Sequence, residues 1–453
     1  MRSPSFRFRA AAGLLAIACT SAIGLAADPS LTPTDESPLF AAETQLTLAA
    51  AQRRALERSR QLAAQDFAVT ASREMAVAAG QLPDPVVKLG VDNLPVNGPD
   101  QFSIGRDFMT MRRIGVMQEL TRSEKLRLRS ERQELEAEKS IAQKSAAVAA
   151  IQRDTAIAWL DRYYAEATAK VITEQSVQAR LEIEAAESAY RAGRSNQADI
   201  FSARGALVGL EDRASETHRR VLNAKTLLAR WIGEAAELPL AEKPATDSIR
   251  LDTRVLDTEL AHHPQIAILS KQEEIASTEA KLAQANKKSD WSVELMYSQR
   301  GSSFSNMVSV SVSIPWQWDQ KNRQDRELAS KLAMAEQSRA EYEDMLRAHV
   351  AEVRTMVTEW ENGRERRGRY ESQLIPLAKE RTQAALAAYR GGKASLTDAL
   401  SARRNEIEVR LQALQLEMES ARLWAQLNFL FPEGVEATHS SFPPMTNSMK
   451  ESK

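Results

Sequence analysis

One uninterrupted stretch of the sequence constrains the fold more than any other feature. Residues 124–190 contain neither proline nor glycine, the two residues that most often interrupt a helix. As a helix, these 67 residues would extend roughly 100 Å at the usual helical rise. This length exceeds that of helices in globular domains, so the stretch predicts a coiled-coil-like rod.

A motif at the end of this stretch occurs twice in the chain. The sequence AYRAGRSNQADIFSAR at residues 189–204 is followed 199 residues later by AYRGGKASLTDALSAR at residues 388–403. Each copy has a glycine two residues after an arginine and an aspartate six residues after that glycine. The repeat indicates an internal duplication of two helical hairpins. Gly193 and Gly392 are expected to form their turns, because a tight reversal needs a residue that accepts a left-handed conformation.

Two short stretches before each long helix alternate between apolar and polar residues. In the second half, Trp291, Val293, Leu295 and Tyr297 alternate with polar residues, and valine then alternates with serine up to about Trp316. Such alternation predicts β-strands that have lipid or a core on one face and water on the other. Each half of the chain is therefore predicted to hold a helix, two strands, a long helix, a turn and a shorter helix.

Four strands are too few to close a barrel with a lumen. Open sheet edges are not tolerated in hydrocarbon. If the sheet lies in a membrane, several copies must complete it, and three copies would supply twelve strands. The predicted fold is mainly α, with a long α-helical coiled-coil barrel and a β-barrel that is completed by trimerisation, four strands coming from each protomer.

The predicted segments follow from composition and periodicity. The division is a signal peptide at residues 1–27, an extended arm at 28–45, a first repeat at 46–232 with strands at about 86–93 and 106–120, a linker at 233–250, a second repeat at 251–430 with strands at about 291–299 and 305–316, and a flexible tail at 431–453. The second long helix, at about 324–389, contains Gly363, Gly368 and Pro376, which should weaken or bend it.

The N-terminus has the basic, apolar and small-residue order of a secretory signal. Cleavage after Ala26 or Ala27 would remove the one cysteine of the chain, Cys19, and with it any disulfide or thiolate chemistry. The alternative is that Cys19 is lipidated. Against lipidation, Ala16 stands where bacterial lipoprotein signals usually have leucine, and the apolar run continues past Cys19.

Composition excludes several functional classes. Hydrophobic residues make up 43% and charged residues 27% of the chain, which is compatible with folding, and the formal net charge of −1 does not suggest a nucleic-acid partner. We find no nucleophile elbow, no phosphate-binding glycine loop and no HExxH motif, so the sequence predicts no enzyme and no cofactor.

The duplicated plan, the paired strands and the Tyr-x-x-Gly turns resemble the TolC family of outer-membrane efflux channels over about residues 46–430. The resemblance implies a homotrimer with a barrel in the outer membrane and a helical tunnel in the periplasm. It also implies two partners, a periplasmic adaptor (membrane fusion protein) and an inner-membrane RND-type pump.

The segment SIPWQWDQKNRQDRE after the last strand is similar to a segment of channels in metal-cation efflux systems. The resemblance therefore favours a passive duct for heavy-metal cations. Drug or organic-solvent efflux, or type I secretion, are alternatives with the same fold. A periplasmic coiled-coil adaptor or structural protein is the alternative of another class.

The resemblance places functional residues at the hairpin tips. Asp199 falls at the family's gate aspartate and Tyr389 at its hydrogen-bonding tyrosine, so the resemblance implies a latch between Tyr389 and Asp199 that holds the two hairpins together. Asp398 falls at an aspartate that lines the closed aperture. A ring of like charges would attract cations. Ser401 and Ala394 stand where the family has a second acid and a gate arginine. The alternative is that both aspartates only cap the helices that they begin.

Other candidate residues have both structural and functional interpretations. Arg191 and Arg390, beside the turn glycines, would contact the adaptor or offset the helix dipole. Trp291, Trp316 and Trp318 are expected to form a membrane aromatic girdle, with core packing as the alternative. The adjacent pair His262 and His263 fits a helix start better than a metal site, and no metal site is predicted.

Overall fold

The structure is a computed structural model that describes residues 44–193 and 196–434. The predicted signal peptide with Cys19, nearly all of the predicted arm and most of the predicted tail lie outside the described residues. The predictions for those segments are therefore not tested by the structure.

The first half of the chain contains the predicted rod as one continuous helix. Helix α3 has 69 residues, because nothing in its sequence interrupts the backbone hydrogen bonds. The hydroxyl groups of Thr47 and Ser59 cap the two shorter helices before the strands. The elements are α1 (Leu48–Arg58), α2 (Arg60–Ala79), β1 (Val86–Asp92), β2 (Met111–Leu120), α3 (Ser123–Arg191) and α4 (Gln197–Ile232).

The second half repeats this order and so confirms the predicted duplication. Its long helix is interrupted by a π-helical turn, η2, that ends two residues before Pro376. Proline cannot donate a backbone hydrogen bond, and the wider turn accommodates the missing donor. The elements are α5 (Leu256–Ala261), α6 (Pro264–Asn286), β3 (Trp291–Gln299), β4 (Met307–Ser313), α7 (Gln324–Arg369), η2 (Tyr370–Leu374), α8 (Ile375–Arg390) and α9 (Leu396–Asn428).

The four strands form one antiparallel sheet in the order β1-β2-β3-β4, as the fold prediction requires. Two strands are shorter than predicted by several residues, and β1 by one. Strand β2 begins at Met111 rather than near residue 106, because Asp107 Oδ1 accepts hydrogen bonds from the backbone of Met109 and Thr110 and forms a turn. Strand β4 ends at Ser313, two residues before Pro315, which cannot donate to a sheet.

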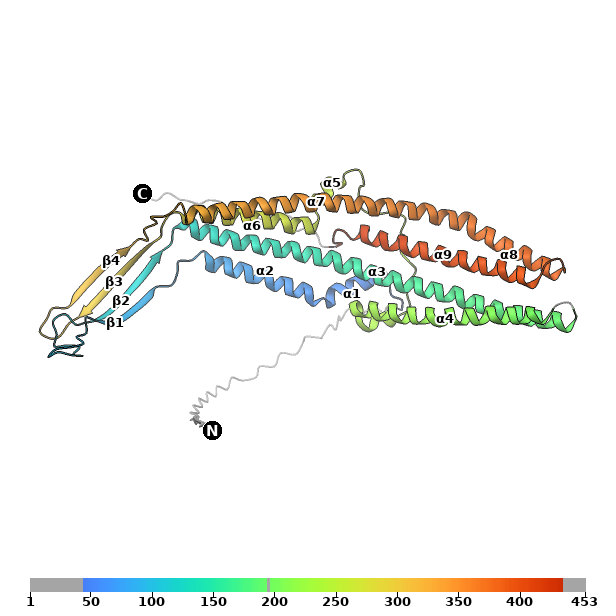
Figure 1. Ribbon diagram of the computed structural model, residues 1–453, viewed down its shortest axis with the longest axis horizontal. Helices are drawn as coiled ribbons and strands as arrows, with labels where there is room; N and C mark the ends of the chain where they lie inside the picture. Colours follow the sequence, from blue (N-terminus) through green and yellow to red (C-terminus); the bar gives the residue numbers. More distant parts are fainter. Residues whose placement is uncertain (1–43, 194–195, 435–453) are drawn as a thin grey trace, which may run out of the picture. The chain divides into compact units, whose positions relative to one another are not determined.

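Helix α3 organises the packing of the helices. It contacts α2 and α6 in its first part and α4 and α9 further along, while α7 packs against α6 and α9. Figure 1 shows the sheet at one end of these helices and the α3–α4 and α8–α9 turns at the other. The duplicated motif therefore places both hairpin tips together, far from the strands.

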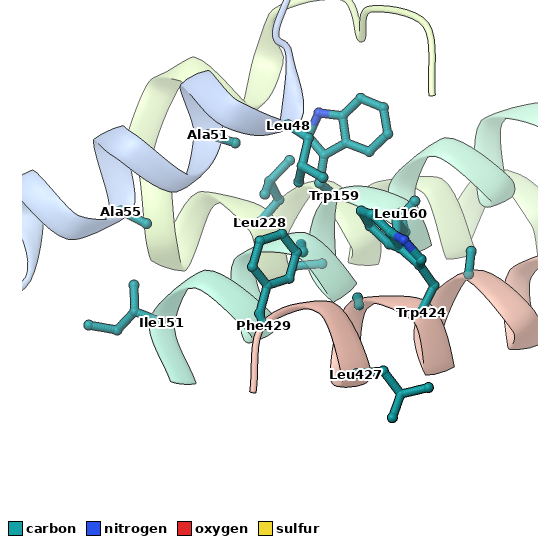
Figure 2. Close-up of a cluster of buried hydrophobic side chains, with 14 of the residues drawn as sticks. Leu48, Ala51, Ala55, Ile151, Trp159, Leu160, Leu228, Trp424, Leu427 and Phe429 are labelled. Carbon is teal, nitrogen blue, oxygen red and sulfur yellow. The ribbon is translucent and has the colours of Figure 1, made fainter. Parts of the chain in front are cut away.

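A cluster of large buried side chains lies midway along the helices (Figure 2). Trp159 and Leu160 of α3 meet Leu228 of α4, and Trp424 and Leu427 come from α9. Buried aromatic and aliphatic side chains of this size dominate the free energy of burial. The cluster therefore joins the two hairpins to the short helix α1, whose Leu48, Ala51 and Ala55 complete it.

Three tryptophan indoles attach irregular segments to this core. Trp159 Nε1 donates to the Leu46 carbonyl at 3.1 Å, Trp360 Nε1 to Thr246 at 3.3 Å, and Trp424 Nε1 to Ser248 at 2.8 Å. The last two acceptors belong to the segment predicted as a linker. Since buried indole N–H groups need acceptors, these bonds hold the segment against the helices rather than leaving it loose.

Candidate functional site

One face of the sheet is apolar across all four strands. The register aligns the side chains in rows, and their exposed fractions lie between 42% for Tyr297 and 75% for Leu89. Exposed apolar surface of this extent marks an interaction surface. The first row is Val87, Val116, Leu295 and Val310, and the second is Leu89, Ile114, Tyr297 and Val308.

The opposite face of the sheet is polar. Lys88 on β1 reaches across β2 to Glu294 on β3, with 2.6 Å between Nζ and Oε2. Arg113 and Asp92 form a second ion pair on this face. Serines from β3 and β4 lie beside these pairs in the register. The sheet thus separates an apolar face from a charged face.

The two edge strands of the sheet each have a neighbour on one side only in this chain. The described strands β1 and β4 pair with β2 and β3, respectively, and not with each other. Unpaired edges expose backbone donors and acceptors that another strand can use. Further strands can therefore pair with the sheet at both of its edges, β1 and β4.

The three candidate tryptophans lie where the sheet meets the helices. Trp291 is the first residue of β3. Trp316 and Trp318 follow β4, and their exposed fractions are 88% and 89%. These values contradict the core-packing alternative for Trp316 and Trp318, because neither side chain is buried in this chain. Their role as a membrane girdle stays a prediction.

The turn glycines of both hairpins adopt left-handed backbone conformations. Gly193 has φ +67° and Gly392 has φ +69°. Their amides donate to the carbonyls of Tyr190 and Tyr389, at 2.9 and 3.0 Å, respectively. The repeat thus places the same residue types in the same turn geometry twice. Arg191 and Arg390, the last residues of their helices, are exposed.

Both candidate gate aspartates take part in capping boxes. The Asp199 carboxylate accepts a bond from the backbone of Asn196, whose side chain accepts one from the Asp199 N–H. Asp398 and Ser395 have the same reciprocal arrangement at the start of α9. Hydrogen bonds from Ser395 lower the pKa of Asp398. The capping role is therefore present in the structure, and a gating role for either aspartate stays a prediction.

Tyr389 lies within a small apolar cluster that joins both hairpin tips. Its ring packs against buried residues of α3, α4 and α9. Its hydroxyl is buried and makes no hydrogen bond among the described residues. The latch predicted between Tyr389 and Asp199 thus lacks a hydrogen bond from this hydroxyl here. The buried members of the cluster are Ala186, Ile200, Ala203 and Leu396.

An ion-pair network between the hairpins was missed from the sequence. Arg403 Nε of α9 lies 3.3 Å from Glu182 Oε1 of α3, and Arg403 Nη1 lies 3.4 Å from Glu406 Oε2. Arg410 Nη2 contacts the other oxygen of Glu406 at 2.9 Å. Burial raises the pKa of Glu182, and Arg403 opposes this effect. The one available signal was that Arg403 ends the duplicated motif.

His263 has a structural role at the start of α6. Its ring caps the helix by accepting a bond from the Gln265 N–H. Burial, above all, lowers its pKa to about 4. His262 is exposed, so the two rings do not converge. Among residues 44–193 and 196–434, no three His, Cys, Asp or Glu side chains gather into a set that could hold a metal ion.

None of the described helices is both long enough and apolar enough to cross a bilayer.

The duplicated hairpins and the two-faced sheet together define the fold of outer-membrane channel proteins. Residues 255–431 match the model of the family described as outer membrane efflux protein. The structure is similar to that of the outer-membrane channel OprN, with a TM-score of 0.72 and 18% identity, over 85% of this chain and 90% of that one. No curated protein sequence matches the chain.

Two further solved structures share the fold. VceC from Vibrio cholerae matches with a TM-score of 0.70 and 19% identity, over 84% of this chain and 95% of VceC. CusC matches with a TM-score of 0.72 and 17% identity, over 84% of this chain and 91% of CusC. The described part of the chain therefore spans nearly the whole length of these channels.

Proposed function

We propose that the chain is the outer-membrane channel of a tripartite efflux pump. The observation that carries this proposal is the sheet, which has an exposed apolar face, a charged face and two open edges. In a bilayer the apolar face would contact lipid, and the charged face would line water. The match of residues 255–431 to the efflux family supports the same function.

Closure of the barrel requires further copies of the chain. Strand β1 of one protomer would pair with β4 of the next, since backbone groups at a sheet edge must be satisfied in hydrocarbon. Three copies would give twelve strands, enough to enclose a water-filled lumen. The helices would then continue the barrel as a periplasmic tunnel. Its hairpin tips would contact a periplasmic adaptor and, through it, an inner-membrane RND-type pump.

The substrate we propose is a heavy-metal cation. This assignment rests on the similarity of SIPWQWDQKNRQDRE to a segment of metal-efflux channels. In the structure its polar side chains bond within the segment and to the end of α6: Asn322 Nδ2 donates to Asp319 Oδ1 at 2.9 Å, and Gln320 Nε2 to the Lys287 carbonyl at 3.1 Å. The segment therefore supports the sheet-to-helix junction, and drugs or organic solvents are alternative cargoes of the same duct.

Localisation and reconstitution test the channel function. We expect the mature chain to fractionate with the outer membrane, to purify as a trimer and to form ion-conducting pores in planar bilayers. Recovery from the soluble periplasm alone would instead support the adaptor or structural alternative. Deletion of the gene, followed by growth on a panel of metals and drugs, tests the substrate. Sensitisation to drugs without sensitisation to metals would refute the metal assignment.

A further inference from the structure

We propose that Arg403 is the positioning residue that holds the two hairpins of each protomer together near the closed end of the tunnel. The role of Arg403 rests on the proposed channel function, because Arg403 would hold the two hairpins of that same channel together. The latch predicted at the tips involves Tyr389, whose hydroxyl makes no hydrogen bond within residues 44–193 and 196–434. The ionic connection through Arg403 lies further from the turns and joins α9 to α3.

The contacts of Arg403 bridge the hairpins. Its guanidinium lies between Glu182 of α3 and Glu406 of α9. The side chains of these two carboxylates are 14% and 3% exposed. Arg403 thus compensates a shielded anion on each hairpin, and Glu406 has a second cation, Arg410, on its own helix. Removal of one partner from such a network leaves uncompensated charge, which costs much more than the net stabilisation of the intact pair.

The surroundings of this network are polar and loosely packed. A cavity of about 400 Å³ lies between α3, α8 and α9, and Arg403 and Glu406 line it. The buried side-chain oxygen of Gln175, also in its lining, has no hydrogen-bond partner among the described residues. Lys379 of α8 and Glu174 of α3 are the other charged groups that line it, together with Arg410. Water can therefore enter on this side when the hairpins separate, whereas the apolar cluster around Tyr389 must come apart at the tips.

Comparison of the two repeats explains why Arg403 crosses between hairpins. Its counterpart in the first copy, Arg204, contacts Glu187 of its own hairpin at 2.8 Å. The position equivalent to Glu187 in the second copy is Leu386. Arg403 consequently has no acid at that position of its own hairpin, and its guanidinium reaches Glu182 of the other hairpin. The difference between the copies turns an intra-hairpin pair into an inter-hairpin contact.

A second pair between the hairpins is more exposed. Arg213 Nη1 and Glu408 Oε1 lie 2.7 Å apart, but their side chains are about half exposed. Solvent and salt screen such pairs, so they contribute little. The ion pair between Arg403 and Glu182 is therefore better shielded from solvent than the pair between Arg213 and Glu408.

Hydrogen exchange of the full chain in detergent tests this latch without requiring pore formation. We expect Arg403→Ala to accelerate amide exchange in residues 176–190 and 396–410 by about tenfold, because the shielded Glu182 carboxylate loses its cation while Glu406 keeps Arg410. Arg404→Ala is the matched control, since Arg404 is the exposed neighbour on the same helix. The double variant Glu182→Gln/Arg403→Ala should restore slow exchange, because it also removes the carboxylate that Arg403→Ala leaves without its cation.

Planar-bilayer recordings of the same variants separate the latch from the channel function. We expect Arg403→Ala to raise the open probability or the mean conductance about tenfold over the wild type and Arg404→Ala. If the wild type forms pores but Arg403→Ala changes neither amide exchange nor conductance, the role of Arg403 is refuted and the channel function stands. If the wild type forms no pores, the channel function fails, and the exchange data still decide whether Arg403 holds the hairpins.

Discussion

The Asp398 Oδ2 atom accepts hydrogen bonds from both the backbone N–H and the hydroxyl of Ser395, at 3.1 and 2.7 Å. The same serine hydroxyl accepts from the Asp398 N–H at 3.1 Å. This reciprocal cap begins α9, and the hydrogen bonds from Ser395 lower the pKa of Asp398. The carboxylate is nevertheless exposed and therefore keeps a full negative charge at neutral pH. Capping and cation attraction at the aperture are thus physically compatible roles.

Substitution can separate these two roles of Asp398. Asn can accept the same capping bonds but carries no charge, so Asp398→Asn should preserve the start of α9. If three such charges line the aperture, the variant should weaken block of the pore by divalent and trivalent cations severalfold. Single-channel recording measures this block. Ser395→Ala is the converse control: it should destabilise α9 by about 1 kcal/mol and leave cation block unchanged. Unchanged block in Asp398→Asn would leave Asp398 as a cap only.

Two adjacent glycines in the second hairpin turn make a matched pair of substitutions. Gly392 has φ +69°, whereas Gly391 has φ −81°. A Cβ atom in the left-handed conformation costs about 1–2 kcal/mol, so Gly392→Ala should open the turn more often. Gly391→Ala should be nearly neutral, because its conformation is ordinary for alanine. Amide exchange of residues 388–396 reports the difference, and equal exchange in both variants would contradict the assigned turn.

The helices and strands were predictable because local patterns determine them. Helix α3 follows from the absence of proline and glycine, and the strands follow from strict alternation near Leu295 and Val310. Boundaries were less predictable. The turn at Asp107 depends on a side-chain bond that periodicity does not reveal.

The contacts between hairpins could not be predicted in the same way. Glu182 and Arg403 are 221 residues apart, and each stands among many charged residues that face solvent on long helices. Helical periodicity places a residue on a face but does not say which distant helix covers that face. Likewise, nothing local shows that Trp360 and Trp424 bind the carbonyls of the linker segment.

The two faces of the sheet predict opposite effects of lysine substitution on membrane insertion for two neighbouring residues of β4. Val310 lies in an apolar row at the middle of the strand, and Ser309 points to the charged face. A lysine on the lipid side near the bilayer midplane costs about 2–4 kcal/mol. Val310→Lys should therefore impair insertion into liposomes, while Ser309→Lys should insert as the wild type does. The fraction of protease-protected barrel measures insertion, and reversed or equal yields would refute the assignment of the faces.

The lowered pKa of His263 predicts how the free energy of unfolding of the helical part of the chain depends on pH. Burial is the main cause that lowers the pKa of His263 to about 4. His349, whose ring centroid lies 4.4 Å from that of His263, lowers it further, and so does Arg153. A bond with the Leu430 backbone acts in the opposite direction. Because the unfolded chain binds a proton near pH 6.5 and the folded chain only near pH 4, protonation favours unfolding between these values. The contribution of His263 is complete above pH 6.5 and is lost as the pH falls toward 4.

Thermal unfolding in detergent between pH 7 and 4.5 tests this dependence. The loss of stability should reach at most about 1.4 kcal/mol per pH unit for the one proton involved. His263→Asn keeps a capping acceptor for α6 but removes the titrating ring, so its unfolding should vary less with pH. His262→Asn, at the exposed neighbour, should retain the wild-type slope. If the wild type and His263→Asn lose stability equally on acidification, His263 is not the residue responsible, and other groups must carry the acid sensitivity of the fold.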